Sequence, residues 1–297
     1  MELRQLRQFV AVAEHLNFRR AAEVLHMAQP PLSVAIRNLE AELGAALFAR
    51  RGRGIELTEA GHAAYTAAKH CLFSAQDVFA AVNTVEAGER GHLRLAFVGS
   101  ATYSALPTLL PAFRKRYPAI QLTLSEATNL QALKLLDARE IDMALVRYPT
   151  THLSTLAYEM FERDRFVAAI PAGHVLARKR HVTLAQLAAH PFIDYAANQV
   201  PGLHALVAFA FQQAGLSPLV VQKAIQVQTV ISLVQSNMGV ALVPSIVGKQ
   251  APRHVVLRPV ADFPAGPEMG VAMAFLAQHA PATVARMREV AAHFVKA

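Results

Sequence analysis

Cysteine and charged residues are scarce in this chain. Its 297 residues include one cysteine, Cys71, which excludes an internal disulfide framework and fits the reducing cytoplasm, where we expect the protein to act. Charged residues make up only 17% and hydrophobic residues 54%, a composition that excludes a disordered chain and allows sizeable cores. The length indicates two or three domains rather than one.

Neither a signal peptide nor a membrane-spanning helix is indicated. Glu2, Arg4 and Arg7 open the sequence with the charge pattern of a helix start, not with an apolar segment. Residues 195–222 and 224–248 carry no Asp, Glu, Lys or Arg, yet both contain Asn, Gln and Pro, which argues against a helix in lipid. We therefore expect no membrane partner.

The sequence also lacks common catalytic and nucleotide-binding motifs. There is no GxGxxG after a strand, no GxxxxGK followed by Ser or Thr, no GxSxG and no HExxH. Thirteen histidines are present, but His174, His181 and His190 have no metal-ligand spacing and no adjacent carboxylate or cysteine set. We expect no catalytic residue, no metal site and no cofactor.

The net charge of +8 is weak support for nucleic-acid binding because of where it lies. Residues 1–90 contain ten Lys/Arg and ten Asp/Glu, whereas residues 91–297 contain nineteen and eleven and supply the whole excess. Local clusters of basic residues must therefore carry any argument for DNA binding.

The region before such a cluster is predicted to be helical. Apolar spacing predicts a first helix over 3–14 and a second over 18–25, with Asn17 as the cap of the second. A third helix begins at Gln29, where two prolines are tolerated in the first turn, and Gly44 suits its end. Two helices joined by a short turn predict a helix-turn-helix, whose second helix lies in the major groove.

A basic hairpin completes this unit. Residues 48–58 place three arginines and two glycines between short apolar strands, which predicts a wing that contacts phosphates or a narrow minor groove. An arginine-glycine turn alone is usually a solvated loop, and helix pairs are common. Their adjacency in this order favours a winged helix-turn-helix over residues 1–58, with the helix-turn-helix at about 18–37.

The side chains that face DNA are predicted from this geometry. Ser33 can donate or accept a hydrogen bond, Arg37 suits phosphate or guanine, and proline rings can contact thymine methyl groups. The candidate DNA-binding residues are Arg20, Gln29, Pro30, Pro31, Ser33, Val34, Arg37, Arg50, Arg51 and Arg53.

A long helix is predicted next, within a linker at residues 59–90. Thr58 can cap it, and apolar residues follow a 3–4 spacing on two adjacent flanks. Burying both flanks is simplest against a second copy and the DNA-binding domain, although an ordinary packed helix fits the pattern equally well. Cys71 is interpreted as a small core residue.

Strands and helices alternate after Gly91. The βαβαβ pattern over 93–146 predicts a parallel sheet, and a second α/β unit follows over 166–244. Two such lobes suggest a ligand held between them at the strand ends. The whole domain spans 91–297, with lobe I at about 91–161 and 266–297 and lobe II at about 162–265.

Polar residues at these strand ends are candidates for ligand binding. Ser100 follows the first strand, where free helix N–H groups could hold an anion. Arg147 ends a buried strand and could pair with a carboxylate, the alternative being a surface ion pair with Asp142 or a neighbour. The candidates are Gly99, Ser100, Thr102, Thr128, Asn129, Arg147, Gln228 and Thr229.

The N-terminal sixty residues resemble the LysR family of transcriptional regulators. The matching positions are Asn17-Phe18-Arg19-Arg20-Ala21-Ala22, Leu25, Gln29-Pro30, Ser33, Ile36, Leu39-Glu40, Leu43-Gly44, Leu47-Phe48, Arg50, Leu57-Thr58 and Ala60-Gly61. Two features depart from the family. Ala28 stands where Ser or Thr is usual, which removes a helix cap, and Val34-Ala35 replaces a commonly polar pair, so base readout from this helix is expected to be sparse and apolar.

The C-terminal half resembles the LysR effector domain, itself similar to type-2 periplasmic binding proteins. Phe97-Val98-Gly99-Ser100, Ile141-Asp142 with Arg147, Gly215-Leu216-Ser217-Pro218 and Gly239–Pro244 carry this resemblance. It is nearest to the subgroup that senses benzoate, muconate or phenylpropenoid acids, although Leu203 stands where some members have an aromatic residue. The resemblance implies Ser100, Thr128 or Asn129, Arg147, Leu203 and Thr229 as pocket residues.

The resulting expectation is an α+β multidomain regulator with a winged helix-turn-helix, a long linker helix and a two-lobed α/β effector domain. The resemblance implies double-stranded DNA, a small carboxylate effector, RNA polymerase and further copies of the chain as partners, with a dimer formed by the linker helix and a tetramer beyond it. One alternative is a cytosolic solute-binding protein or enzyme with an appended helical domain. Another is a DNA protein that needs no ligand.

Overall fold

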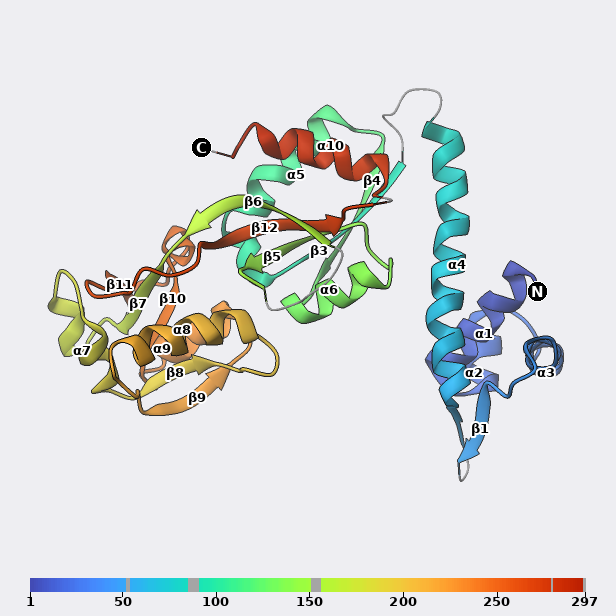
Figure 1. Cartoon of the computed structure of the whole chain (residues 1–297), viewed down its shortest axis with the longest axis horizontal. Helices are drawn as coiled ribbons and strands as arrows, with labels where there is room; N and C mark the ends of the chain where they lie inside the picture. The colour runs from blue at the N-terminus through green and yellow to red at the C-terminus, as the bar shows by residue number, and fades with distance from the viewer. Residues whose placement is uncertain (52–53, 85–90, 151–155, 279, 296–297) are drawn as a thin grey trace. The chain divides into compact units, whose positions relative to one another are not determined.

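The computed structural model describes residues 1–51, 54–84, 91–150, 156–278 and 280–295 (Figure 1). The chain forms two compact units. The first comprises Met1–Ala87 with Ala138–Glu140, and the second comprises Gly88–Asp137 with Ile141–Ala297. In the described part of the chain, no helix combines the length and the hydropathy that crossing a bilayer requires.

The first unit is a three-helix bundle with a hairpin and a long helix. Its core contains Phe9 from the first helix and Leu32, Ile36 and Leu39 from the third, all at most 2% exposed. The elements are α1 (Leu3–His15), α2 (Phe18–Val24), α3 (Gln29–Leu43), β1 (Phe48–Arg51), β2 (Gly54–Leu57) and α4 (Glu59–Thr84).

Local chemistry sets the ends of these helices. The Asn17 side chain accepts a hydrogen bond from the Arg20 N–H and caps α2, as predicted. His26 adopts a left-handed φ of 52° in the turn before α3, and Gly44 ends α3 with a φ of 68°. Ala28 precedes α3 in an extended conformation and offers no side-chain cap.

The hairpin is anchored to the helices beneath it. Strands β1 and β2 pair antiparallel from Phe48 opposite Leu57, and Glu40 of α3 accepts hydrogen bonds from the Leu47 and Phe48 N–H groups. Thr58 caps α4 by accepting from the Gly61 N–H at 2.9 Å. These contacts hold the wing at a defined position beside α3.

Helix α4 buries one of its two apolar flanks within the unit. Ala68 is 3% exposed and packs with the bundle core, and half-buried Leu72 lies against it. On the other flank Cys71 and Val78 are exposed, Val78 by 62%. Cys71 is therefore exposed in the single chain, and its interpretation as a small core residue requires a second copy of the chain.

The second unit contains two five-stranded sheets, each in its own lobe. The first sheet has the order β4-β3-β5-β12-β6. Strands β3, β4 and β5 are parallel, and β12 runs antiparallel to both β5 and β6. Its elements are β3 (Gly91–Phe97), η1 (Gly99–Tyr103), α5 (Ala105–Arg116), β4 (Ile120–Glu126), α6 (Asn129–Asp137), β5 (Met143–Tyr148), β6 (Leu156–Asp164), β12 (Met269–Leu276) and α10 (Ala282–Ala292).

The second lobe has the strand order β11-β7-β10-β8-β9. Strands β10, β8 and β9 are parallel, and β7 and β11 are antiparallel to their neighbours. Its elements are β7 (Phe166–Pro171), η2 (Val175–Arg178), α7 (Leu184–Ala188), β8 (Phe192–Tyr195), α8 (Pro201–Gln213), β9 (Val220–Ala224), α9 (Val227–Gln235), β10 (Val240–Pro244), η3 (Ser245–Lys249) and β11 (Val255–Pro259).

The prediction of parallel sheets was only partly right. Three antiparallel strands, β6, β11 and β12, were not predicted, because the prediction rested on alternation of strands with helices and these strands are not separated from their neighbours by long helices. They matter for the site: the chain passes between the lobes directly from β6 to β7 and again from β11 to β12 (Figure 1). The predicted order of the other strands and helices is confirmed.

Candidate functional site

Most of the predicted DNA-binding side chains are exposed in the first unit. Val34 is 45% exposed although apolar, whereas Ser33 is half-buried. Arg20 and Arg37 have no ion pair within the described part of the chain. The exposed members of the predicted set are Arg20, Gln29, Pro30, Pro31, Val34, Arg37, Arg50 and Arg51.

The two described arginines of the wing differ in their ion pairing. Arg51 is tied across the hairpin to Glu56 at 2.8 Å. Arg50 is exposed and makes no ion pair with the described residues, so its guanidinium can reach a phosphate without losing a partner. Arg53 lies outside the described residues.

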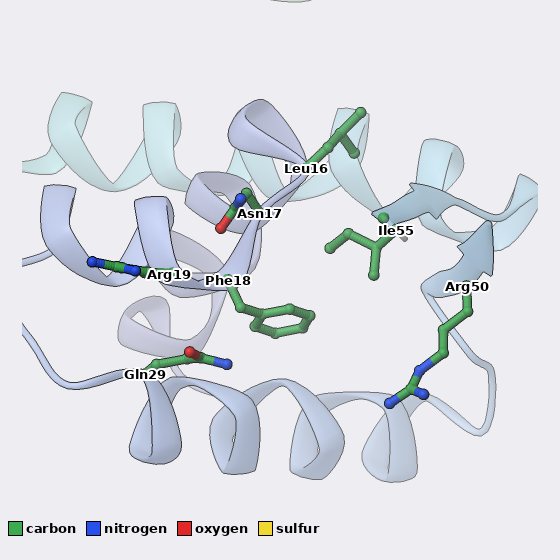
Figure 2. A pocket seen from close by; sticks show the side chains of 8 residues that line it. Leu16, Asn17, Phe18, Arg19, Gln29, Arg50 and Ile55 are labelled. Carbon is green, nitrogen blue, oxygen red and sulfur yellow. The ribbon is translucent and has the colours of Figure 1, made fainter. Parts of the chain in front are cut away.

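A hollow of about 400 Å³ separates the wing from the start of α3. Figure 2 shows the Phe18 ring between Gln29 on one side and Arg50 on the other. Its lining residues are Leu16, Asn17, Phe18, Arg19, Gln29, Arg50, Gly54 and Ile55. Sequence reasoning passed over Arg19, the neighbour of predicted Arg20. Its guanidinium pairs with Glu23 one turn along α2.

A buried arginine lies at the centre of the second unit. Arg147, at the end of β5, is 4% exposed. Its Nε donates to the Ser100 hydroxyl at 3.0 Å and its Nη1 donates to Asp164 at 2.9 Å. Its Nη2 is buried and has no hydrogen-bond partner among the described residues. The surface ion pair with Asp142 is therefore wrong, because Asp142 instead binds Arg94.

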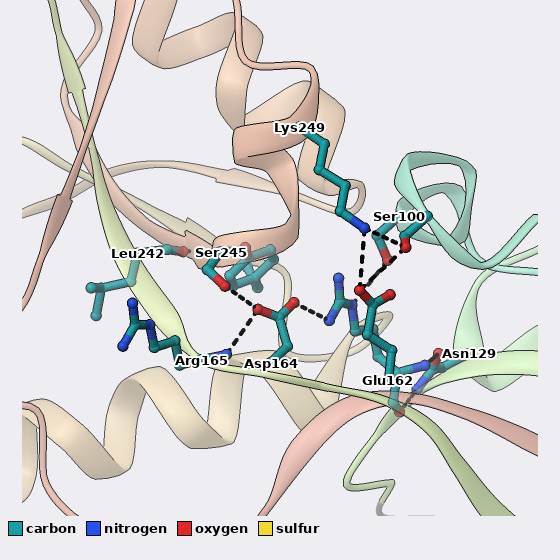
Figure 3. A network of polar contacts seen from close by, with 11 residues as sticks. Ser100, Asn129, Glu162, Asp164, Arg165, Leu242, Ser245 and Lys249 are labelled. Carbon is teal, nitrogen blue, oxygen red and sulfur yellow. Dashed lines mark hydrogen bonds and ion pairs between the residues drawn. The ribbon is translucent and has the colours of Figure 1, made fainter. Parts of the chain in front are cut away.

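Asp164 joins the two lobes at this point. It ends β6 of the first sheet, and its second oxygen accepts from the Ser245 hydroxyl at 2.6 Å and from the Arg165 N–H at 2.8 Å (Figure 3). Ser245 begins η3 of the second lobe. Neither Asp164 nor Ser245 was among the predicted site residues: Asp164 ends the unpredicted antiparallel strand β6, and Ser245 follows the predicted strand β10 but meets Asp164 only because η3 lies against the first lobe.

A second polar contact joins the lobes nearby. Lys249 of η3 donates to the Ser104 hydroxyl at 2.6 Å and pairs with Glu162 at 3.5 Å (Figure 3). Tyr103 of η1 packs against the core of the second lobe, and burial raises the pKa of its hydroxyl. Burial also raises the pKa of fully buried Tyr195, whose hydroxyl donates to the Leu242 carbonyl at 3.2 Å.

A small pocket lies beside Arg147, between the lobes. Its volume is about 20 Å³, enough for about one water molecule. The first lobe supplies Asn129, Leu130, Leu133, Arg147 and Thr150, and the start of α8 supplies Val200, Pro201, Gly202 and Leu203. Predicted residues Asn129, Arg147 and Leu203 are thus brought together, with Ser100 hydrogen-bonded to Arg147 behind them.

Thr128 and Asn129, between which the sequence left the choice open, make different contacts in the structure. Asn129 donates to the Arg147 carbonyl at 2.6 Å and accepts from the Arg147 N–H at 2.9 Å, so its amide holds the end of β5 in place. At the start of α6, the Thr128 hydroxyl accepts from the Gln131 N–H, and the Thr128 N–H and hydroxyl both donate to Gln131 Oε1. Asn129 lines the pocket and Thr128 does not.

The remaining candidates lie around this pocket rather than in it. A Cβ on Gly99 would lie 2.9 Å from Gln228 Nε2, so this glycine allows Gln228 to approach. Thr102 donates to the Gly99 carbonyl at 2.6 Å. Gln228 and exposed Thr229 lie in the first turn of α9. Within the described part of the chain, the buried Gln228 Oε1 has no hydrogen-bond partner.

Comparison with known proteins identifies the arrangement. Residues 3–62 match the model of the bacterial regulatory helix-turn-helix protein of the lysR family, and residues 86–295 match that of the LysR substrate binding domain. The chain belongs to the LysR family. It is a DNA-binding transcriptional regulator with an effector domain and not an enzyme, so the enzyme alternative is wrong.

Relatives of this LysR-family regulator match most of its length. It is 36% identical over 248 residues to AlsR of Bacillus subtilis (strain 168), covering 82% of this chain and 81% of AlsR. It is 40% identical over 255 residues to CatR of Pseudomonas putida, covering 84% and 85%. The crystal structure of full-length CbnR complexed with its target DNA is similar with a TM-score of 0.78, at 26% identity and 99% coverage of both chains.

Proposed function

We propose that this LysR-family regulator is controlled by a small organic carboxylate bound between its two lobes at Arg147. The buried Nη2 of Arg147 carries the proposal, since a buried guanidinium N–H without an acceptor is costly and a carboxylate would supply one. No other described residue in the pocket lining is cationic.

The start of α8 supports the same ligand from the opposite lobe. Pro201 is in the first turn of this 13-residue helix, followed by Gly202 and Leu203. The first N–H groups of a helix have no intrahelical acceptor and favour an anion. A carboxylate between Arg147 and this turn would therefore be held by both lobes at once.

The pocket is too small for such a ligand in this conformation. A volume of about 20 Å³ holds about one water molecule, so the lobes or their side chains must move apart to admit an organic acid. The ligand then binds one arrangement of the lobes better than another, which is the condition for it to shift their equilibrium. This movement is our proposed origin of regulation.

The ligand class rests on chemistry and on resemblance. Leu130, Leu133 and Leu203 give the pocket apolar walls that suit an aromatic or unsaturated body. The effector domain also resembles the aromatic-acid subgroup, and we take an aromatic or unsaturated acid as the effector.

The DNA complex is proposed to need more than one copy of the chain. The exposed flank of α4 with Cys71 and Val78 suits a dimer, which would place two readers on two half-sites. Edge strand β9 exposes Val220 and Val221 with neighbouring Leu219, a surface that suits further association into a tetramer. RNA polymerase is the proposed further partner, in the cytoplasm.

Fluorescence anisotropy with the purified full-length protein on its own upstream promoter duplex tests the effector. We expect one or more of benzoate, muconate and cinnamate to change the affinity or the anisotropy of the complex at millimolar concentration or below. Arg147→Gln should abolish the response and leave binding of the duplex without acid intact. Arg178→Gln, an exposed arginine of the second lobe, is the matched control. A response that survives Arg147→Gln contradicts the proposal.

A further inference from the structure

Helix α8 lines a second and larger depression beyond the Arg147 pocket. Two adjoining hollows of about 350 and 380 Å³ share Leu206, Phe209 and Pro267. Each is within the range of about 300–1,000 Å³ typical of small-molecule sites. The Arg147 pocket, at about 20 Å³, is far smaller.

The walls of this depression are mainly apolar and aromatic. The Phe166 and Phe263 rings lie 5.4 Å apart between centroids, and Phe209 of α8 faces the loop at Gly266. Aromatic rings in the wall favour a planar guest, because contact with a ring adds to the gain from burying apolar surface. The full lining is Pro149, Thr150, Gly202, Ala205, Leu206, Phe209, Arg163, Asp164, Arg165, Phe166, Val260, Phe263, Pro264, Gly266, Pro267, Glu268 and Met269.

The charged residues at the rim of the hollow differ in whether they have an ion-pair partner. Arg163 is paired with Glu268. Asp164 is paired with Arg147. Arg165 is exposed, and within the described part of the chain its guanidinium has neither a hydrogen bond nor an ion pair. An apolar hollow with one unpaired cation at its rim is complementary to a hydrophobic anion.

The depression is separate from the Arg147 pocket. A Cβ on Gly202 would lie only 2.6 Å from the Pro149 carbonyl oxygen, so the first turn of α8 meets the end of the first lobe there. The two sites share only Thr150 and Gly202 of their linings, and this close contact lies between them. A ligand on the outer side does not reach Arg147 unless the contact opens.

We propose that the hinge-side hollow formed by Phe209, Phe263 and Arg165 is a second small-molecule site, which takes an aromatic carboxylate or sulfonate of one or two rings. The rings lie between Phe209 and Phe263, and the anionic group accepts hydrogen bonds from Arg165. The site is distinct from the proposed effector pocket and does not require it.

Helix α8 links this site to the rest of the domain. Its first turn lines the Arg147 pocket, and its next two turns, with Ala205, Leu206 and Phe209, line the hollow. Because one helix forms a wall of both sites, a ligand in the hollow restrains the same element that must move to open the inner pocket. Occupancy of the hollow is therefore expected to alter the response to an inner ligand.

Titration of the full-length protein with 8-anilinonaphthalene-1-sulfonate, an aromatic sulfonate that fluoresces in apolar sites, tests the proposal. We expect one strong site per chain. Ala205→Trp, at an exposed position of α8, fills the hollow and should weaken binding at least tenfold. Arg165→Gln should weaken it about fivefold, and exposed Arg178→Gln should have no effect. Circular dichroism confirms that each variant is folded.

The Arg147→Gln variant distinguishes this site from the effector pocket. Binding of the dye should be unchanged in Arg147→Gln, whatever the outcome of the promoter experiment with carboxylic acids. Unchanged affinity in folded Ala205→Trp overturns the second site, as does loss of binding in Arg147→Gln, which would place the dye in the inner pocket.

Discussion

A buried charge must be compensated, and Arg147 is compensated by very few groups. The guanidinium meets one carboxylate, Asp164, and one hydroxyl, Ser100, and its buried Nη2 amino group has no hydrogen-bond partner among the described residues. Breaking a buried ion pair by removing one partner typically costs about 3–5 kcal/mol, because the other charge stays buried alone. Asp164 thereby stabilises the centre of the domain, and the unpartnered Nη2 is the group that we propose binds the ligand.

Asp164→Asn tests this dependence. We expect the free energy of unfolding of the effector domain to fall by about 3 kcal/mol in urea denaturation, because Arg147 loses its counter-charge in a buried site. Glu159→Gln is the control, since Glu159 pairs with Arg288 at the surface, where an ion pair contributes about 1 kcal/mol or less. Equal losses in both variants would mean that burial of Arg147 has no special cost.

His174 gives the domain a predicted acid sensitivity. Its Nδ1 accepts from the Leu176 N–H, and its ring packs edge-on to His190 with centroids 4.5 Å apart. Burial, followed by the charge of His190, lowers the pKa of His174. Below its ordinary pKa of about 6.5, the unfolded chain therefore binds a proton there more readily than the folded chain, so stability falls as pH drops.

The measurement is urea unfolding at pH 7.5 and pH 5.5. His174→Asn keeps an acceptor for the Leu176 N–H but does not titrate, so the loss of stability between the two pH values should become smaller. His181→Asn, at an exposed position, should leave that loss unchanged. If His174→Asn leaves it unchanged as well, the ring of His174 is not responsible.

Among the elements, α3 begins without a side-chain N-cap. Ala28 precedes it with extended φ and ψ of −75° and 149°, the geometry of an N-cap, but has no side chain to accept from the first N–H groups. Ala28→Ser should raise the free energy of unfolding of the DNA-binding unit by about 1 kcal/mol. Differential scanning calorimetry measures the gain. Ala41→Ser, exposed later in α3, should give no gain.

The wing is the element whose role is chiefly electrostatic. Arg50 is exposed and has no described ion-pair partner. Arg50→Ala should weaken binding to promoter and scrambled duplexes alike, and reduce the slope of log affinity against log salt by about 1. Anisotropy titrations across a salt series give both quantities. Lys115→Ala, exposed on α5, should change neither, and an equal effect of both variants would remove the special role of the wing.

At the scale of the whole molecule, α4 is expected to decide assembly. Val78 exposes 62% of its surface on the flank of α4 that also carries exposed Cys71, whereas Ala68 on the other flank packs with the bundle. Val78→Asp should place a carboxylate in the proposed dimer seam and raise the dimer dissociation constant at least tenfold. Sedimentation equilibrium measures it, with Ala63→Asp, at an exposed α4 position, as the control. A dimer as tight as the wild type would exclude this seam.

The first unit and the chain order of most elements could be predicted from the sequence because their causes are local. Asn17, Gln29 and Gly44 determine where helices begin and end through hydrogen bonds and backbone preferences of near neighbours. Apolar spacing then selects the buried face, so the exposed arginines follow. The family resemblance added DNA binding, which composition and net charge alone could not establish.

What only the tertiary structure decided lies where residues distant in sequence meet. Arg147 was a candidate from its strand end, but its partner Asp164 and the Ser245 that holds Asp164 come from other strands and the other lobe. The antiparallel strands β6, β11 and β12 and the hollow along α8 likewise depend on pairing across the chain. Local propensity carries no information about such pairing, because its free energy comes from burial and ion pairing that exist only once the lobes are assembled.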